Sequence, residues 1–199
     1  MSSTICALAT PPGAGGIAVV RVSGPEAYAV VGEIFTPRNP AKRVAEAKGY
    51  TAMLGHYHLR GEEMDETIAL FFRAPHSYTG EDTAELQCHG SPAVLRAGLQ
   101  ALFAAGARQA LAGEFTKRAF LNGRMDLTQA EAVIDLIDAE TAEAARNAAA
   151  QVDGALRRPL EQVYDALLGL TSRFYAVVDY PDEDIEDLTL AETERTLTE

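Results

Sequence analysis

The sequence predicts an α+β fold, in which a mixed β-sheet domain with helices precedes an all-α segment. Strand-like and helix-like patterns alternate over residues 1–112, whereas every pattern after Gly113 is helical. The charge changes at the same place: residues 1–118 carry 11 basic and 11 acidic side chains, and residues 119–199 carry 6 and 18. A chain of 199 residues has room for one or two domains. We therefore predict two domains, 1–118 and 119–199.

Runs rich in β-branched or alternating apolar residues predict the strands. The first run stops at Pro11-Pro12, and two later runs are joined around Arg60-Gly61-Glu62 as an antiparallel pair with one solvated face. The predicted strands cover residues 4–9, 17–22, 50–59, 66–74, 83–89 and 108–112.

Two helices are predicted between these strands. Ser23 to Glu26 has the spacing of a capping box, which predicts a helix starting at Ser23. Ser91-Pro92 starts the second helix, with the serine as its cap, and Gly106 ends it. Residues 36–48 hold prolines and mixed charges, which predicts a surface loop.

The second part predicts helices throughout. A short helix over residues 114–121 stops at Asn122-Gly123, and Thr128 to Glu131 forms a second capping box. The following apolar stripe continues to a break at Gly154, and a further helix runs to about Val178. An acidic stretch over residues 179–187 follows, and then a third capping box over residues 189–192. Because that last helix has hardly begun at Glu199, we expect the chain to be the front part of a longer protein.

Composition excludes several classes of protein. No apolar run approaches the roughly 20 residues that cross a bilayer, and the first residues do not resemble a secretion signal. Cys6 and Cys88 are too few for a disulfide framework or a four-cysteine zinc site. We expect a cytoplasmic protein with no membrane partner and no metal site. The net charge of −12 disfavours strong nucleic-acid binding by this chain alone.

A glycine-rich loop over residues 10–16 invites comparison with a phosphate-binding loop. No Gly-Lys-Ser or Gly-Lys-Thr follows it, and a strand rather than a helix comes next, so we reject that interpretation. Two interpretations stay open, a tight loop that lets the backbone pack closely and the edge of a small-ligand site.

The candidate binding residues are charged side chains in apolar surroundings. Arg21 lies inside the apolar strand over residues 17–22 and requires a carboxylate, either within the protein or on a ligand. Glu85 shares one strand face with Gln87 and His89, and it suits a ligand edge with two adjacent N–H donors. Cys88 points to the other face, so we expect a buried thiol and no Cys–His catalytic pair.

Two more charged positions complete this set. Arg124 follows the Asn-Gly that ends a helix, from where it is placed to turn back towards the sheet domain. Glu81 lies four residues before Glu85, and we expect it in a turn with little effect on ligand binding.

Three segments together resemble the N-terminal region of the MnmE (TrmE) family of tRNA-modification GTPases. They are TPPGAGGIAVVRVS at residues 10–23, SYTGEDTAELQCHG at residues 77–90 and GEFTKRAFLNGRMDLTQAEAVIDLID at residues 113–138. The acidic stretch DYPDED at residues 179–184 also resembles this family. The resemblance spans nearly all 199 residues in the same order.

The resemblance implies a fold and a ligand. It implies that residues 1–118 form an aminomethyltransferase-like domain for tetrahydrofolate binding and dimerisation, and that residues 119–199 are the first part of a helical domain. The ligand is a tetrahydrofolate derivative, the 5-formyl or 5,10-methylene form. The family's folate contacts match Arg21, Glu85 and Arg124 here. No catalytic residue is assigned to this chain. Ala14 stands where many relatives carry a charged residue, which puts a loop contact there in doubt.

The resemblance also implies an activity for the full protein. The family forms homodimers and, with the flavoprotein MnmG, adds a (carboxymethyl)aminomethyl group to carbon 5 of the wobble uridine, position 34, of certain tRNAs. GTP, magnesium and potassium are bound by a GTPase domain whose motifs the 199 residues lack, so we expect this chain to be inactive on GTP. The alternative is a non-catalytic dimerisation scaffold with a vestigial folate pocket.

Overall fold

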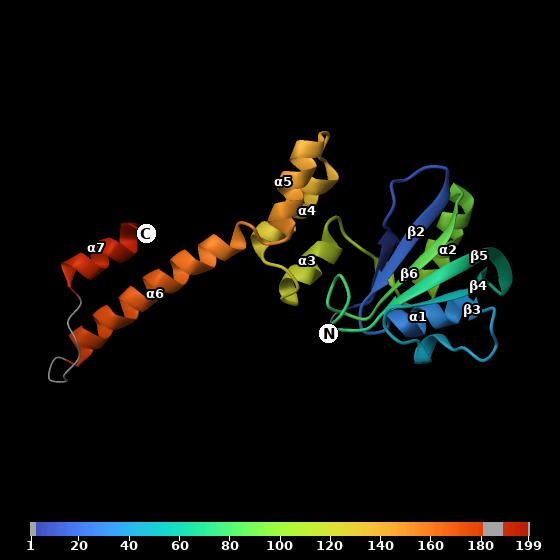
Figure 1. Cartoon of the computed structure of the whole chain (residues 1–199). Helices are drawn as coiled ribbons and strands as arrows, with labels where there is room; N and C mark the ends of the chain where they lie inside the picture. The colour runs from blue at the N-terminus through green and yellow to red at the C-terminus, as the bar shows by residue number, and fades with distance from the viewer. Residues whose placement is uncertain (1–2, 181–188, 199) are drawn as a thin grey trace. The chain divides into compact units, whose positions relative to one another are not determined.

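The computed structural model describes residues 3–180 and 189–198, and the chain divides into two compact units, Met1–Met125 and Asp126–Glu199. The first unit contains a mixed sheet with helices, and the second contains helices (Figure 1). The predicted α+β fold followed by a helical segment is therefore confirmed.

Seven strands of the described residues form one sheet in the order β3-β4-β5-β6-β2-β1-β7. Their bounds are β1 Ile5–Leu8, β2 Gly15–Ser23, β3 Phe35–Pro37, β4 Thr51–Leu59, β5 Glu62–Phe72, β6 Thr83–Gly90 and β7 Arg108–Gln109. Every neighbouring pair is antiparallel except β1 and β7. All six predicted strands exist, and β3 is a short edge strand inside the segment predicted as a loop.

Helices α1 (Ala27–Ile34) and α2 (Pro92–Ala104) cover one face of this sheet. They share a single core with the side chains of alternate strand positions. The core includes Val20 and Val22 of β2, Phe71 of β5 and Leu86 of β6, each no more than 3% exposed. The intervening strand positions face the other way, and on β6 these are Glu85, Gln87 and His89, as predicted. The charged candidate residues therefore lie on the sheet face opposite α1 and α2.

The capping box predicted at Ser23 is wrong. Ser23 is the last residue of β2 and is fully buried, with its hydroxyl 2.7 Å from that of Thr79 and donating to Glu81 Oε2 at 3.0 Å. Helix α1 begins later, at Ala27, and its N-cap residue Glu26 makes no side-chain cap. The capping-box spacing predicted the wrong role because a serine hydroxyl can bond side chains distant in sequence as well as cap a helix.

The hairpin between β4 and β5 is tighter than predicted. Arg60 and Gly61 both have positive φ angles, 54° and 84°, which suits a two-residue turn between twisted antiparallel strands. Strand β5 consequently begins at Glu62 rather than at residue 66. The predicted loop over residues 36–48 is likewise only partly a loop, because β3 pairs with β4 and a 3-10 helix spans Val44–Glu46.

The second unit contains α4 (Leu127–Ile137), α5 (Ala142–Val152), α6 (Arg157–Asp179) and α7 (Leu190–Thr198). The cap of α4 is Asp126, which accepts from the amide of Gln129 at 2.8 Å, while the Gln129 side chain accepts from the amide of Asp126 at 3.0 Å. The box predicted at Thr128 to Glu131 is thus wrong. Its threonine hydroxyl instead donates to Asp126, at 2.7 Å.

The predicted continuous helix before Gly154 is divided in two. Thr141 caps α5 by accepting from the amide of Ala144 at 3.1 Å, which starts a new helix there. The box at residues 189–192 is confirmed, since Thr189 Oγ1 accepts from the Glu192 amide and the Glu192 carboxylate accepts from the Thr189 amide, both at 3.3 Å. Most of the predicted acidic interruption lies outside the described residues. Among the described helices, none is long and apolar enough to cross a membrane.

We predict that Gly55→Ala destabilises the first unit by about 1–3 kcal/mol. A Cβ at this position in β4 would collide with the backbone oxygen of Thr36 and lie 2.6 Å from Cζ of the buried Phe35. Chemical denaturation measures the change. Gly32→Ala in α1 is the matched control, because its Cβ would meet only Val44 atoms at 3.7 Å or more, and it should raise stability. Equal stability of the two variants would contradict the prediction.

Candidate functional site

Arg21 and Glu85 form a cross-strand ion pair at the centre of the candidate site. They lie directly opposite each other on β2 and β6. Arg21 Nε donates to Glu85 Oε1 at 2.8 Å, and Arg21 Nη2 lies 2.8 Å from the same oxygen. The carboxylate that Arg21 requires is therefore internal. Among the described residues, Glu85 Oε2 and Arg21 Nη1 have no hydrogen-bonding partner, which leaves one acceptor and one donor for a ligand.

Two aromatic side chains flank the Arg21 guanidinium. Its central carbon lies 5.1 Å from the ring centroid of Tyr78 and 5.5 Å from that of Phe115. Tyr78 belongs to the connection between β5 and β6, and Phe115 to helix α3 (Glu114–Leu121). The hydroxyls of Tyr78 and Thr116 are 2.9 Å apart, so the two segments also bond to each other. Cation–π contacts of this kind hold a guanidinium in place while leaving its edge free.

Arg124 contacts the same connection but not the ion pair. A Cβ on Gly80 would lie 3.2 Å from Arg124 Cγ, so the arginine stem packs against this glycine, whose φ of +76° favours glycine. Within the described residues Arg124 has no ion pair or hydrogen bond with Arg21 or Glu85. The structure therefore pairs two of the three predicted residues directly, and the third, Arg124, follows α3 and packs against Gly80 of the β5–β6 connection.

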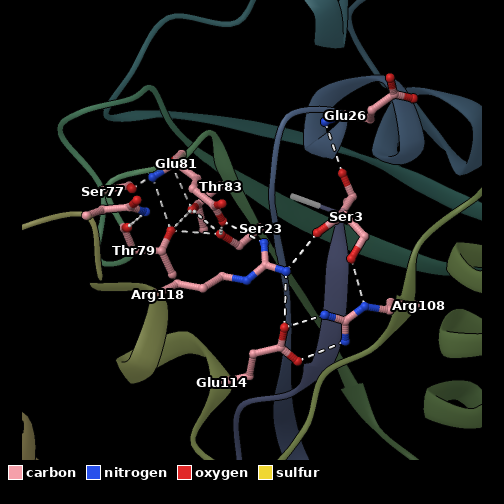
Figure 2. Close-up of polar contacts among 12 residues, drawn as sticks. Ser3, Ser23, Glu26, Ser77, Thr79, Glu81, Thr83, Arg108, Glu114 and Arg118 are labelled. Atoms are coloured by element: carbon pink, nitrogen blue, oxygen red, sulfur yellow. Dashed lines mark hydrogen bonds and ion pairs between the residues drawn. The ribbon is translucent and has the colours of Figure 1, made fainter. Parts of the chain in front are cut away.

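A buried arginine fastens α3 to the sheet (Figure 2). Arg118 is 8% exposed; its Nη1 donates to Glu81 Oε2 at 2.9 Å, and its Nη2 donates to the carbonyl of Ser3 at 2.8 Å and to Glu114 Oε1 at 3.1 Å. Glu81 lies in the connection between β5 and β6, where a turn was expected, and its carboxylate bonds both Arg118 and Ser23.

Glu114 carries the strongest electrostatic perturbation of this network. Its carboxylate bonds the exposed Arg108, the buried Arg118 and the amide of Leu111. The hydrogen bond from Arg108 is the main cause that lowers the pKa of Glu114 from 4.5 to about 2. Glu114 is therefore ionised at neutral pH.

The thiol and histidine beside Glu85 do not form a catalytic pair. Cys88 is buried, which raises the pKa of its thiol to about 11, and its Sγ lies 3.7 Å from the carbonyl of Ala18. His89 points to the opposite face and bonds Asp65, with 2.6 Å between Nδ1 and Oδ1. The prediction of a structural thiol at Cys88 is confirmed.

Tyr78, Phe115 and Arg118 were not selected from the sequence. One signal was present: Phe115, Arg118 and Ala119 have the i, i+3, i+4 spacing that places residues on one helix face. No sequence pattern pairs that helix face with Tyr78 or Glu81, because those residues lie more than 30 positions earlier.

Comparison with known proteins agrees with this architecture. Residues 4–124 match the family model described as GTP-binding protein TrmE N-terminus, and residues 127–199 match the MnmE helical domain. The chain belongs to the MnmE (TrmE) family. Proteins named tRNA modification GTPase MnmE are similar over most or all of the chain. They come from Thermus thermophilus (48% identity, 100% of this chain), Bacteroides fragilis (48%, 92%) and Halorhodospira halophila (50%, 92%).

The chain spans less than half the length of these MnmE relatives. It covers 45% of the Thermus protein, 39% of the Bacteroides protein and 38% of the Halorhodospira protein. The structure therefore describes two parts of the MnmE architecture, the N-terminal sheet unit and a helical unit.

We predict that Glu114→Gln lowers the free energy of unfolding by about 1–2 kcal/mol at pH 7, because it weakens charge-assisted bonds to two arginines. The folded-state pKa of Glu114 lies below its ordinary value of 4.5. Its contribution is therefore complete above that pH and is lost as the pH falls towards 2. Urea titrations between pH 7 and pH 2 should show the two stabilities converging on acidification.

The control for this titration is Glu33→Gln, which alters an exposed carboxylate on α1. It should leave the wild-type pH profile unchanged. A stability difference between wild type and Glu114→Gln that stays constant down to pH 2 would contradict the assignment.

Proposed function

We propose that the first unit binds a tetrahydrofolate derivative at Arg21, Glu85 and Arg124. The observation that carries this proposal is the Arg21–Glu85 pair: the two side chains are 24% and 17% exposed, and the Arg21 guanidinium lies over the rings of Tyr78 and Phe115. A charged pair at the surface of a sheet, flanked by aromatic rings, suits a planar heterocycle with hydrogen-bonding edges.

The donor and acceptor set fits a pterin ring. Glu85 is a carboxylate with a free oxygen, and it accepts from the ring amino group and the adjacent ring N–H. Arg21 orients the Glu85 carboxylate and has Nη1 left over for a carbonyl. Arg124 supplies a second cation for the anionic part of the ligand. The bound folate would supply the one-carbon unit, in the 5-formyl or 5,10-methylene form.

For the whole protein we propose the activity named for its relatives, tRNA modification coupled to GTP hydrolysis. The site of modification would be carbon 5 of the wobble uridine, reached together with the flavoprotein MnmG in the cytoplasm. GTP, magnesium and potassium would be bound outside residues 1–199. The second unit carries 5 basic and 18 acidic side chains over residues 126–199, which argues that cations for the tRNA come from elsewhere.

We also propose a homodimer formed through the first unit. Its sheet face opposite α1 and α2 leaves Ile17, Leu54 and Ile68 exposed by 70%, 41% and 42%. Leu54 and Ile68 are cross-strand partners, and the same row continues through Gln87 to Val19, two residues from Ile17, so the three apolar side chains lie close together on this face. Because residues 1–118 have no net charge, two copies approach without electrostatic repulsion.

The second candidate function is a dimerisation scaffold with a vestigial pocket. The same ion pair favours it, because Arg21 and Glu85 satisfy each other without any ligand. The two functions differ in one property, the affinity for folate.

We predict that Glu85→Gln weakens binding of 5-formyltetrahydrofolate at least tenfold, about 1.4 kcal/mol. Glutamine keeps the shape but presents an amide donor to a donor on the ligand and loses a charged acceptor. Calorimetry measures the affinity, and circular dichroism checks the fold. Glu66→Gln is the matched control, because Glu66 lies on β5 in an exposed pair with Arg38, and it should bind as wild type does. Equal affinities of wild type and Glu85→Gln would contradict folate binding at Glu85 and favour the dimerisation scaffold.

We predict that Ile68→Lys converts the dimer to monomers at micromolar concentration, because it places two charges in a desolvated apolar contact. Light scattering on wild type should give twice the 21.3 kDa chain mass. Leu111→Lys changes an equally apolar residue, 73% exposed and outside the strands, and should leave the dimer intact. A dimeric Ile68→Lys protein would place the contact on another surface.

A further inference from the structure

The two rings that flank Arg21 belong to segments outside the sheet. Tyr78 lies between β5 and β6, and Phe115 lies in the first turn of α3. Neither segment is held by a strand ladder at these positions. The distance between the two rings, and so the width of the site, depends on what fastens these segments to the sheet and to each other.

Arg118 fastens both segments. It lies three residues after Phe115, on the same face of α3, and its guanidinium reaches Glu81 of the β5–β6 connection and the backbone of Ser3 (Figure 2). Glu81 in turn accepts from Ser23, which lies two residues after Arg21 in β2. Through these bonds one side chain connects the Phe115 segment, the Tyr78 segment and the Arg21 strand.

Arginine has the geometry for this role and lysine does not. A planar guanidinium directs fixed N–H groups at several acceptors at once, whereas an ammonium is a single point charge on a flexible stem. The side chains of Arg118 and Glu81 are only 9% and 15% exposed, so water is a poor substitute for either partner.

We propose that Arg118, through its pair with Glu81, is a positioning residue for the folate site. It sets the separation of Tyr78 and Phe115 around Arg21 and thereby the affinity for the ligand, without touching the ligand. This inference rests on the proposed function of the first unit.

The test is a double-mutant cycle on 5-formyltetrahydrofolate affinity. Arg118→Lys should weaken binding at least fivefold in the wild-type background. In a Tyr78→Leu background it should weaken binding no more than twofold, because the Tyr78 ring that Arg118 positions is then absent. Glu81→Gln breaks the same pair from the other side and should show the same pattern. Equal fold-losses in both backgrounds, for either variant, would overturn the positioning role.

Arg73→Lys is the matched control. Arg73 bonds Asp82 of the same connection at 2.8 Å, but its other partners are the carbonyls of Ala45 and Ala47 and the ring of Tyr28, none of which belongs to α3. It should lower thermal stability and leave the affinity within twofold of wild type. An affinity loss as large as that of Arg118→Lys would show that general destabilisation, and not the loss of the Arg118–Glu81 pair, lowers the affinity.

Amide hydrogen exchange on the ligand-free protein separates this inference from the proposed function. Arg118→Lys should speed exchange at least tenfold in residues 77–82 and 114–121 and leave β4 and β5 unchanged. If wild type binds no folate but Arg118→Lys still speeds exchange in these two segments, the proposed folate site is overturned, and the role of Arg118 is only to stabilise the two segments. If exchange does not rise in these segments, the positioning role is overturned whatever the affinity.

Discussion

A charged side chain on a half-buried strand must find its counter-charge within the fold, and this constraint organises the first unit. Helices α1 and α2 occupy one face of the sheet, so every charge on β2 and β6 is directed to the other face. There Arg21 meets Glu85 at 2.8 Å. One turn of α3 supplies a second buried cation, Arg118, and the β5–β6 connection supplies its carboxylate, Glu81. The two ion pairs lie on neighbouring parts of the same face.

The second pair has the larger structural effect because it joins segments that are distant in sequence. Ser3, Glu81 and Arg118 come from the start, the middle and the end of the first unit, and all three meet at one guanidinium. Such a junction fixes the rings of Tyr78 and Phe115 without placing either in a regular strand. The candidate site is thus assembled by a buried polar network, whereas the hydrophobic core lies on the far side of the sheet.

The two units differ in how they present apolar and charged surface. The first unit has a hydrophobic core and balanced charge, while long α6 in the second has no buried residue, and Leu167, Leu168 and Phe174 along it are 45–58% exposed. The same two family regions match a Thermus thermophilus relative that is more than twice as long as the chain. We propose that ligand binding and self-association both belong to the first unit.

The sequence by itself determined the local elements, because these follow from periodicity and turn chemistry. Alternation of apolar and polar residues predicted strands β1, β2, β5 and β6 and the face shared by Glu85 and Gln87. The Ser91-Pro92 pair predicted that helix α2 starts at Pro92. Family motifs also singled out Arg21, Glu85 and Arg124. The sequence failed where a polar side chain had several possible partners. Ser23 and Thr128 each have the spacing of a helix cap, but their hydroxyls bond Glu81 and Asp126 instead. No sequence pattern indicated that Glu81 pairs with Arg118.

Only the tertiary structure decided those partnerships, because hydrogen bonds between side chains depend on which segments meet in space. The register of β2 against β6 put Arg21 opposite Glu85, and a shift of one residue would have sent the two side chains to opposite faces. The docking of α3 brought Arg118 to Glu81, which also accepts from Ser23, and brought Phe115 to Arg21. Sequence periodicity carries no information about contacts across 30 or more residues, and the walls of the site consist of such contacts.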